Sequence, residues 1–157
     1  MRWQRERTMP VPPFSKQNIV NFFESRDYQY YELRFKDNDS HENDGDFLIE
    51  FSYDSELRCD HSFRLSCQNG VIFLMRGYTN IRFPPEKKPA LLASLNTFLI
   101  EHAWPKTFVV GEEALQVMTE VNFDFTPGVT QELFDDMVGD QLRASYDVWR
   151  WLAKHEI

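Results

Sequence analysis

The sequence predicts an α+β domain in which three helices pack on an antiparallel sheet of about five to six strands. Three observations lead to this prediction. An Asn-Gly dipeptide at 69–70 joins two strand-like segments, a second hairpin turns near residues 111–113, and three segments carry apolar residues at helical spacing. Read along the chain, the predicted order is α-β-β-β-β-α-β-β-α.

The first third of the chain predicts one helix and two strands. Ser15 is a suitable N-cap for a helix that ends near Arg26. The aromatic and branched residues of Tyr28–Phe35 predict a strand. A polar, acidic loop at 37–46 follows, and the alternation of apolar and polar residues over 47–53 predicts a half-buried strand.

The next two strands form the clearest hairpin in the sequence. Successive side chains of a strand point to opposite faces, and the alternation over Cys59–Gln68 therefore separates an inward set from a polar set. Asn69-Gly70 tolerates the positive φ of a type I′ turn, so Val71–Tyr78 is predicted to return as the paired strand. The residues expected to face inward are Cys59, His61, Phe63, Leu65 and Cys67.

The remaining elements are a helix, a hairpin and a long final helix. Proline suits a first helical turn, which predicts a helix over Pro89–Ala103. Thr107–Val110 and Leu115–Phe125 are predicted to pair as a hairpin that turns at 111–113. The final helix is predicted over Thr130–Ala153, because apolar residues recur there every three or four positions. These are Phe134, Val138, Leu142, Tyr146 and Trp149.

Size and charge restrict the kind of protein. A chain of 157 residues favours a single domain. We expect residues 1–13 to form a flexible tail and residues 14–157 to form the domain, and the sequence leaves both Met1 and Met9 as candidate starts. The net charge of −8 disfavours nucleic-acid binding. No signal sequence or membrane-spanning run is recognised, which predicts a cytoplasmic protein.

No residue pattern points to a catalytic, cofactor or metal site. Cys59 and Cys67 lie eight residues apart on one strand, about 26 Å at the rise of a strand, so with His61 they do not converge on one ion. Buried, reduced and unreactive cysteines are expected instead. The acidic loop at 37–46 lacks the glycine and glutamate of a calcium loop. The carboxylates at helical spacing on the last helix are expected to face solvent: Glu132, Asp136 and Asp140.

Two segments of the second half carry a family resemblance. The helix that ends at 102–106 (His-Ala-Trp-Pro-Lys), the strand Thr107–Val110 after it, and the strand Val117–Phe125 leading into Pro-Gly-Val at 127–129 resemble the YbjN-like family. Leu95-Asn96 in the middle helix matches as well. The resemblance covers Ser15 to Leu152. It implies a fold similar to type III secretion chaperones, which are small acidic dimers, and a non-enzymatic, protein-binding role.

The residues and the resemblance together predict a protein-binding module of bacterial signalling, chaperone-like or regulatory, that binds another protein and forms a homodimer. Aromatic residues make up 15% of the chain, more than a small core needs. The expected partner-binding residues are Tyr28, Tyr30, Tyr31 and Trp151. One alternative is an enzyme or small-ligand-binding protein whose site is assembled from distant residues. A structural subunit of a larger assembly is another.

Overall fold

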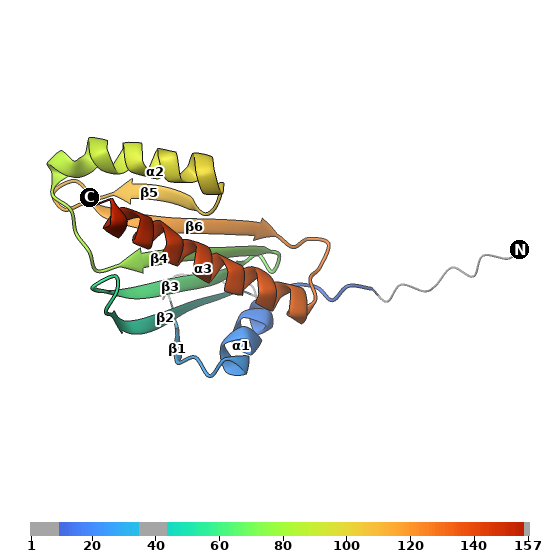
Figure 1. The fold of residues 1–157 in the computed structure, drawn as a ribbon. Coiled ribbons are helices and arrows are strands. Elements are labelled where there is room, and N and C mark those ends of the chain that lie inside the picture. The colour runs from blue at the N-terminus through green and yellow to red at the C-terminus, as the bar shows by residue number, and fades with distance from the viewer. Residues whose placement is uncertain (1–9, 35–43, 156–157) are drawn as a thin grey trace, which may run out of the picture.

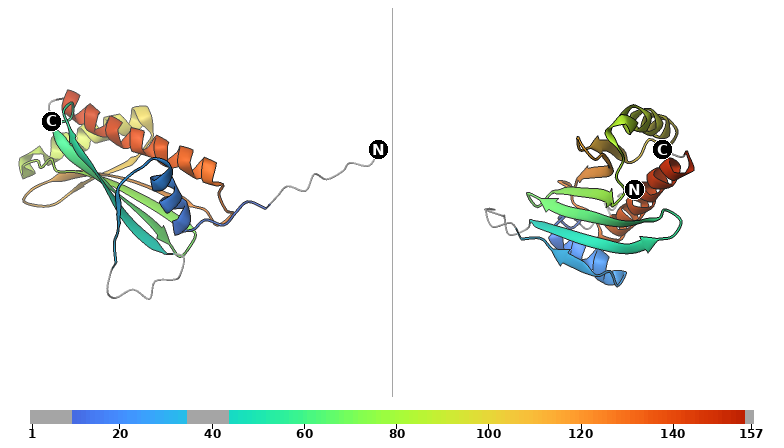
Figure 2. Two further views of the ribbon diagram at one scale, coloured as in Figure 1. Left: turned by 90° about the horizontal axis from the view of Figure 1, so that it is seen from below. Right: turned by 90° about the vertical axis from the view of Figure 1, so that its left-hand side faces the viewer.

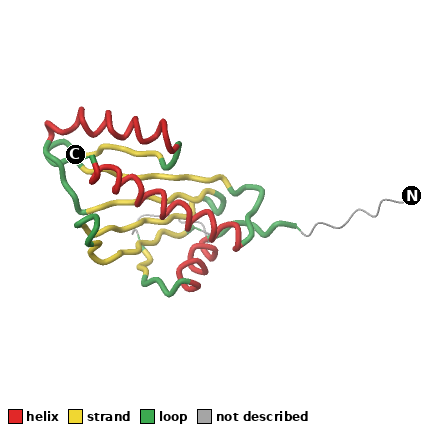
Figure 3. The backbone as a smooth tube through the Cα atoms, in the orientation of Figure 1, coloured by secondary structure: helices red, strands yellow, loops and turns green. Residues whose placement is uncertain are grey.

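The protein is a six-stranded antiparallel sheet with its helices on one side (Figures 1 and 3). A computed structural model describes residues 10–34 and 44–155. The strand order is β1-β2-β3-β4-β6-β5, and every neighbouring pair is antiparallel. The predicted α+β class and the predicted order of elements are both confirmed.

The first helix, α1, spans Lys16–Ser25 and begins as predicted. The backbone N–H of Gln17 donates to the Ser15 hydroxyl at 3.3 Å, and the side-chain oxygen of Asn18 accepts from the Ser15 N–H at 2.9 Å. These bonds satisfy N–H groups that a helix start leaves without partners. The helix turns three buried residues toward the sheet: Ile19, Phe22 and Phe23.

The first strand is shorter than the sequence predicts. β1 spans only Tyr30–Glu32, and it pairs with β2, which spans Gly45–Asp54. Tyr28 comes before the pairing begins, and Phe35 lies outside the described residues. Most of the acidic loop, residues 37–43, also lies outside them, as do residues 1–9 of the predicted tail.

β3 spans Cys59–Gln68 and β4 spans Ile72–Thr79, close to the predicted hairpin. Asn69 and Gly70 have φ values of 52° and 66°, and the N–H of the next residue, Val71, donates back across the turn at 3.2 Å. This is the backbone geometry that favours an Asn-Gly dipeptide. The predicted inward parity is confirmed, because all five inward residues of β3 are buried.

The second half of the chain adds two helices and two strands. A short 3₁₀ turn at Pro85–Lys87 leads into α2, Lys88–His102, and then into β5, Lys106–Val110. β6, Gln116–Asp124, enters the sheet between β4 and β5 and leaves β5 at the edge. The last helix, α3, spans Gln131–Lys154.

The core lies between the sheet and the helices. α3 runs diagonally across the sheet, with α1 beside its N-terminal half, while α2 lies along the edge strand β5 and also contacts α3 (Figures 1 and 2). Phe134 of α3 packs at the centre of an aromatic cluster with Phe14, Phe73 and Phe125. Among the described residues, no helix is both long and apolar enough to cross a membrane.

Candidate functional site

The helices cover one face of the sheet, and no helix of the described residues lies on the opposite face (Figure 2). We call this opposite face the outer sheet face. Its side chains alternate along the strands with the buried ones, so they point away from α1 and α3. It is defined by eight residues of β2 to β6: Leu48, Arg64, Leu74, Arg76, Tyr78, Phe108, Met118 and Glu120.

The charged residues of the outer sheet face pair with one another. The strand register sets Arg64, Arg76 and Glu120 opposite one another on β3, β4 and β6. The Arg76 guanidinium donates to Glu120 at 2.7 Å, and Lys106 of β5 lies 3.9 Å from the same carboxylate. Arg64 donates to Asp46 of β2 at 2.8 Å. Each of these charged side chains therefore has an opposite charge beside it within the face.

The outer sheet face also carries five apolar or aromatic residues, which lie beside polar ones such as Ser62, Gln116 and Asn122. A solvated sheet face normally carries polar residues that alternate with the core. Here Leu48, Leu74, Tyr78 and Met118 are half-buried, and Phe108 is 38% exposed. Aromatic residues, methionine and arginine are the residue types enriched in protein–protein interfaces. The outer sheet face therefore has the composition of a contact surface.

The structure separates the three tyrosines that the sequence grouped as partner-binding residues. The Tyr28 ring packs 5.3 Å from Phe51, and the Tyr30 ring stacks 4.9 Å from Phe23, both on the helix side of the sheet. Tyr31 points the other way and is 58% exposed. Of these three, Tyr31 is the one whose side chain is mostly exposed to another molecule.

Trp151, the fourth predicted residue, joins α3 to α2. Its indole N–H donates to the Ser94 hydroxyl at 2.9 Å, and its ring lies 5.7 Å from the ring of Phe98. The side chain is half-buried, with much of its surface in contacts within the chain.

Most of the exposed apolar residues lie in one stretch of the chain that the sequence patterns did not indicate. Nine large hydrophobic residues are exposed in the described part of the chain, and five of them lie between 92 and 110. We call these five the α2–β5 apolar group: Leu92, Ile100, Trp104, Phe108 and Val110. One sequence signal for it was available, because residues 89–100 contain no charged side chain.

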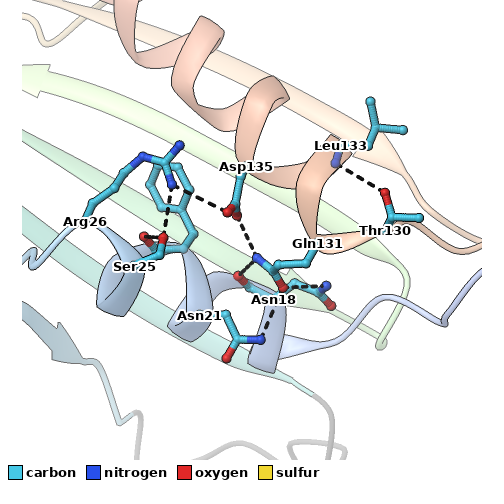
Figure 4. Close-up of polar contacts among 9 residues, drawn as sticks. Asn18, Asn21, Ser25, Arg26, Thr130, Gln131, Leu133 and Asp135 are labelled. Atoms are coloured by element: carbon cyan, nitrogen blue, oxygen red, sulfur yellow. Dashed lines mark hydrogen bonds and ion pairs between the residues drawn. The ribbon is translucent and has the colours of Figure 1, made fainter.

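A polar contact fixes α1 to the start of α3 (Figure 4). The amide oxygen of Gln131 accepts from the side-chain N–H₂ groups of Asn18 at 3.1 Å and Asn21 at 3.2 Å. The N–H₂ group of Gln131 donates to the backbone carbonyl of Asn18 at 3.0 Å. Arg26 adds an ion pair with Asp135 at 3.6 Å. Every amide here has a partner within the molecule, so the contact serves the fold. The three predicted carboxylates of α3 are exposed, as expected: Glu132, Asp136 and Asp140.

One of the two buried cysteines, Cys59, lies beside a histidine on the helix side of the sheet. Cys59 Sγ is 4.0 Å from His61 Nδ1, and the His61 ring packs 4.7 Å from Tyr146 and 5.7 Å from Trp149. Burial raises the pKa of Cys59 and raises the pKa of Tyr146 to about 12. It also raises the pKa of Cys67 to about 11. A reactive cysteine needs a lowered pKa, so these thiols are unsuited to nucleophilic attack.

Metal binding finds no support in the same region. In the segments that the structure describes, no three side chains among His, Cys, Asp and Glu come together in a way that would hold an ion. The two cysteines are free and buried.

His61 is expected to make stability depend on pH. Burial lowers its pKa, against smaller opposite effects of Asp54 and Asp60. Below about pH 6.5 the unfolded chain then binds more protons than the folded chain, so the free energy of unfolding falls as the pH falls. One proton limits the slope to about 1.4 kcal/mol per pH unit. Urea unfolding at pH 5.5 and 7.5 measures this difference.

The matched comparison for that measurement uses two variants. His61→Phe, which keeps a ring among the aromatic neighbours, is expected to remove most of the difference between the two pH values. His102→Gln changes an exposed histidine and is expected to leave it unchanged. An equal dependence on pH in wild type and His61→Phe contradicts the assignment to His61.

Comparisons with known proteins agree on the fold. A family model described as "YbjN: Putative bacterial sensory transduction regulator" matches residues 15–145. The crystal structure of YbjN from E. coli, described as "a putative transcription regulator", has a TM-score of 0.63 at 11% identity, over 89% of this chain and 92% of that one. An uncharacterized protein from Methanothermobacter thermautotrophicus has a TM-score of 0.56 at 12% identity, over 90% and 99%. No curated protein matches the chain.

Proposed function

The chain belongs to the YbjN family, and on that premise we propose that it is a non-enzymatic, protein-binding regulator that works as a homodimer. The outer sheet face contacts the partner protein. The family description supports the regulatory role, and the structure of E. coli YbjN is likewise described as that of a regulator. The cytoplasm remains the expected compartment.

The observation that carries this proposal is the composition of the outer sheet face. Tyr78, Met118 and Phe108 stand on three neighbouring strands, where the register places Met118 directly opposite Phe108. The neighbouring charges are already paired within the face. A partner that covers the centre of this face therefore buries apolar area while Arg64 and Arg76 keep their acidic partners, and burying a charge without a partner is costly in an interface.

The shifted pKa values of one cysteine and one histidine support a non-enzymatic role. The group around Cys59 and His61 places a thiol beside an imidazole, the pair of side chains that a cysteine-dependent enzyme uses. Burial raises the pKa of the thiol and lowers the pKa of the imidazole. Both groups are therefore neutral near pH 7, and the ion pair that activates a catalytic cysteine does not form.

The negative net charge of the chain favours a partner protein that carries a basic segment. The chain carries a net charge of −8, and such a surface speeds association with a basic protein at low salt. Of the partner residues assigned from sequence, Tyr31 is best placed, because its register partner Leu48 belongs to the outer sheet face. Tyr28, Tyr30 and Trp151 contribute only the parts of their rings that remain exposed.

Site-specific crosslinking in native cells tests the proposed face. A photo-crosslinking phenylalanine analogue at Tyr78 or Phe108 is expected to capture another protein. The same analogue at Glu132, an exposed residue on the helix side, is expected to capture much less of it. In the purified complex, Tyr78→Asp is expected to weaken binding at least about tenfold, since a charge replaces a central ring. Capture from Glu132 alone, or unchanged affinity of Tyr78→Asp, contradicts the proposal.

A further inference from the structure

His61 is buried among aromatic side chains that join β3 to the C-terminal half of α3. Its imidazole is 4% exposed. The ring lies 4.7 Å from the Tyr146 ring and 5.7 Å from the Trp149 ring, both on α3. These two rings also pack on Phe63 of β3, at 6.0 Å and 5.7 Å. The C-terminal half of α3 therefore rests on β3 through a histidine, a side chain that can gain a charge near physiological pH.

The folded arrangement around His61 suits a neutral ring and not a charged one. In the described part of the chain, its one hydrogen-bonding contact is with Cys59, whose Sγ lies 4.0 Å from Nδ1. None of the ion pairs among the described residues includes His61. A thiol is a weak acceptor, and a charge that is buried without a partner is costly. A second proton on this ring therefore opposes the packing of α3.

The carboxylates nearest to His61 are bonded to other groups. The charged and titratable side chains that face it come from three elements: Cys59 and Asp60 of β3, Asp54 at the end of β2, and Tyr146 and Arg150 of α3. Thr79, opposite His61 on β4, carries no charge. Asp54 accepts from two backbone N–H groups of the turn after β2 at 2.8 Å and 2.9 Å, and Asp60 accepts from the Asn80 side chain at 3.0 Å. Both carboxylates raise the pKa of His61, but the larger effect of burial lowers it.

The part of α3 that packs on His61 follows every strand in the sequence. We call residues 146–154 the terminal segment of α3. Its release breaks no strand pairing, because all six strands precede it. The helix before it has its own contacts with the sheet: Ser145 accepts from the Thr119 hydroxyl at 2.9 Å, and Phe134 lies in the aromatic cluster. Proteins open locally in such units while the rest of the fold remains closed.

Two features reduce the cost of releasing the terminal segment. The indole N–H of Trp149 is buried and has no hydrogen-bond partner among the described residues, so it gains a bond to water on release. Arg150 pairs with Glu56 at 3.6 Å and with Asp147 at 3.3 Å, but all three side chains are about half exposed or more. Exposed ion pairs of this kind contribute little to stability.

We propose that the terminal segment of α3 is an acid-sensitive switch, which protonation of His61 releases from β3 while residues 131–145 remain on the sheet. Release brings the imidazolium into water and exposes Trp149, and it uncovers Cys59 beside His61. Cys67, at the other end of β3, lies beside Lys16 of α1 and stays covered. The surface that opens is on the helix side of the sheet, so the switch does not depend on the function proposed for the outer sheet face.

Pulse labelling of the full chain with N-ethylmaleimide tests the release. Trypsin places the two cysteines in separate peptides, residues 59–64 and 65–76, so both are measured in one wild-type sample. Each rate is divided by the rate of the urea-unfolded chain at the same pH. From pH 7.5 to pH 5.5 the ratio for Cys59 is expected to rise about three- to tenfold, because a released histidine titrates near about 6.5. The ratio for Cys67 is expected to stay unchanged.

Variants of the histidines test which side chain is responsible. His61→Phe cannot take up a proton and is expected to remove the rise at Cys59. The rings of His102 and His155 lie 5.9 Å and 4.1 Å from the Trp151 ring of the terminal segment, and both histidines are exposed. The double variant His102→Gln, His155→Gln is therefore the control and is expected to keep the rise. Circular dichroism checks that the variants are folded.

Hydrogen exchange of the wild-type chain locates the opening without any substitution. After correction for intrinsic exchange rates, protection of residues 146–154 is expected to fall between pH 7.5 and pH 5.5, and protection of residues 131–145 is expected to persist. Equal rises in labelling at Cys59 and Cys67, or equal losses of protection along α3, would show that the whole domain opens and would overturn the local switch. No rise at Cys59, or the same rise in folded His61→Phe, would overturn the role of His61.

Discussion

Phe134→Ala is expected to lower the free energy of unfolding by about 3–5 kcal/mol, the range for a buried phenylalanine replaced by alanine. Phe134 is 0% exposed. Its ring lies 5.0 Å from Phe73, 5.6 Å from Phe14 and 6.4 Å from Phe22. The residue thus joins α3 to the sheet, to α1 and to the segment before α1. Loss of the ring leaves a cavity where these parts meet.

The neighbouring residue provides the control. Leu133 is 53% exposed on the same turn of α3, and Leu133→Ala is expected to change the free energy of unfolding by less than about 0.5 kcal/mol. Urea unfolding followed by circular dichroism measures both variants. Similar losses for the two would show that the aromatic cluster is not the main contact of α3, and the packing described above would then be wrong.

The regular elements could be predicted because their patterns are local. The alternation over β3 assigned each side chain to a face, since neighbours in a strand point to opposite sides. The stripe of α3 identified the long helix in the same way. β1 was predicted too long because aromatic composition does not show where pairing begins. Tyr28 belongs to the aromatic segment, yet it packs on Phe51 before the strand starts.

The candidate site was harder to predict, because it depends on which elements become neighbours. The pairing of Arg76 with Glu120 joins residues 44 positions apart and exists only because β6 lies beside β4. The contact of Trp151 with Ser94 joins residues 57 positions apart. α2 presents a different difficulty. It is apolar on several sides, so periodicity alone does not show that Leu92 and Ile100 face outward.

Gly77→Ala is expected to destabilise the protein by about 1–3 kcal/mol, the usual cost of adding a methyl group to a full core. Gly77 lies on β4 with its missing side chain toward α3. A Cβ atom there would lie 2.5 Å from the Thr119 hydroxyl and 2.8 Å from the Phe63 ring. That hydroxyl donates to Ser145 of α3 at 2.9 Å in a buried contact between sheet and helix. The added methyl group therefore displaces a residue that fixes α3.

The same substitution at Gly139 is expected to have the opposite effect. Gly139 lies within α3, where an added Cβ would meet only the flexible ends of Arg143 at 3.8 Å and Arg26 at 4.0 Å. Alanine favours a helix over glycine, so Gly139→Ala is expected to raise the free energy of unfolding by about 0.5–1 kcal/mol. Opposite signs for the two variants in one urea series would confirm that β4 requires glycine for close packing beneath α3. A loss at both positions would contradict this, because the cost would then follow from glycine replacement as such and not from contact with Thr119.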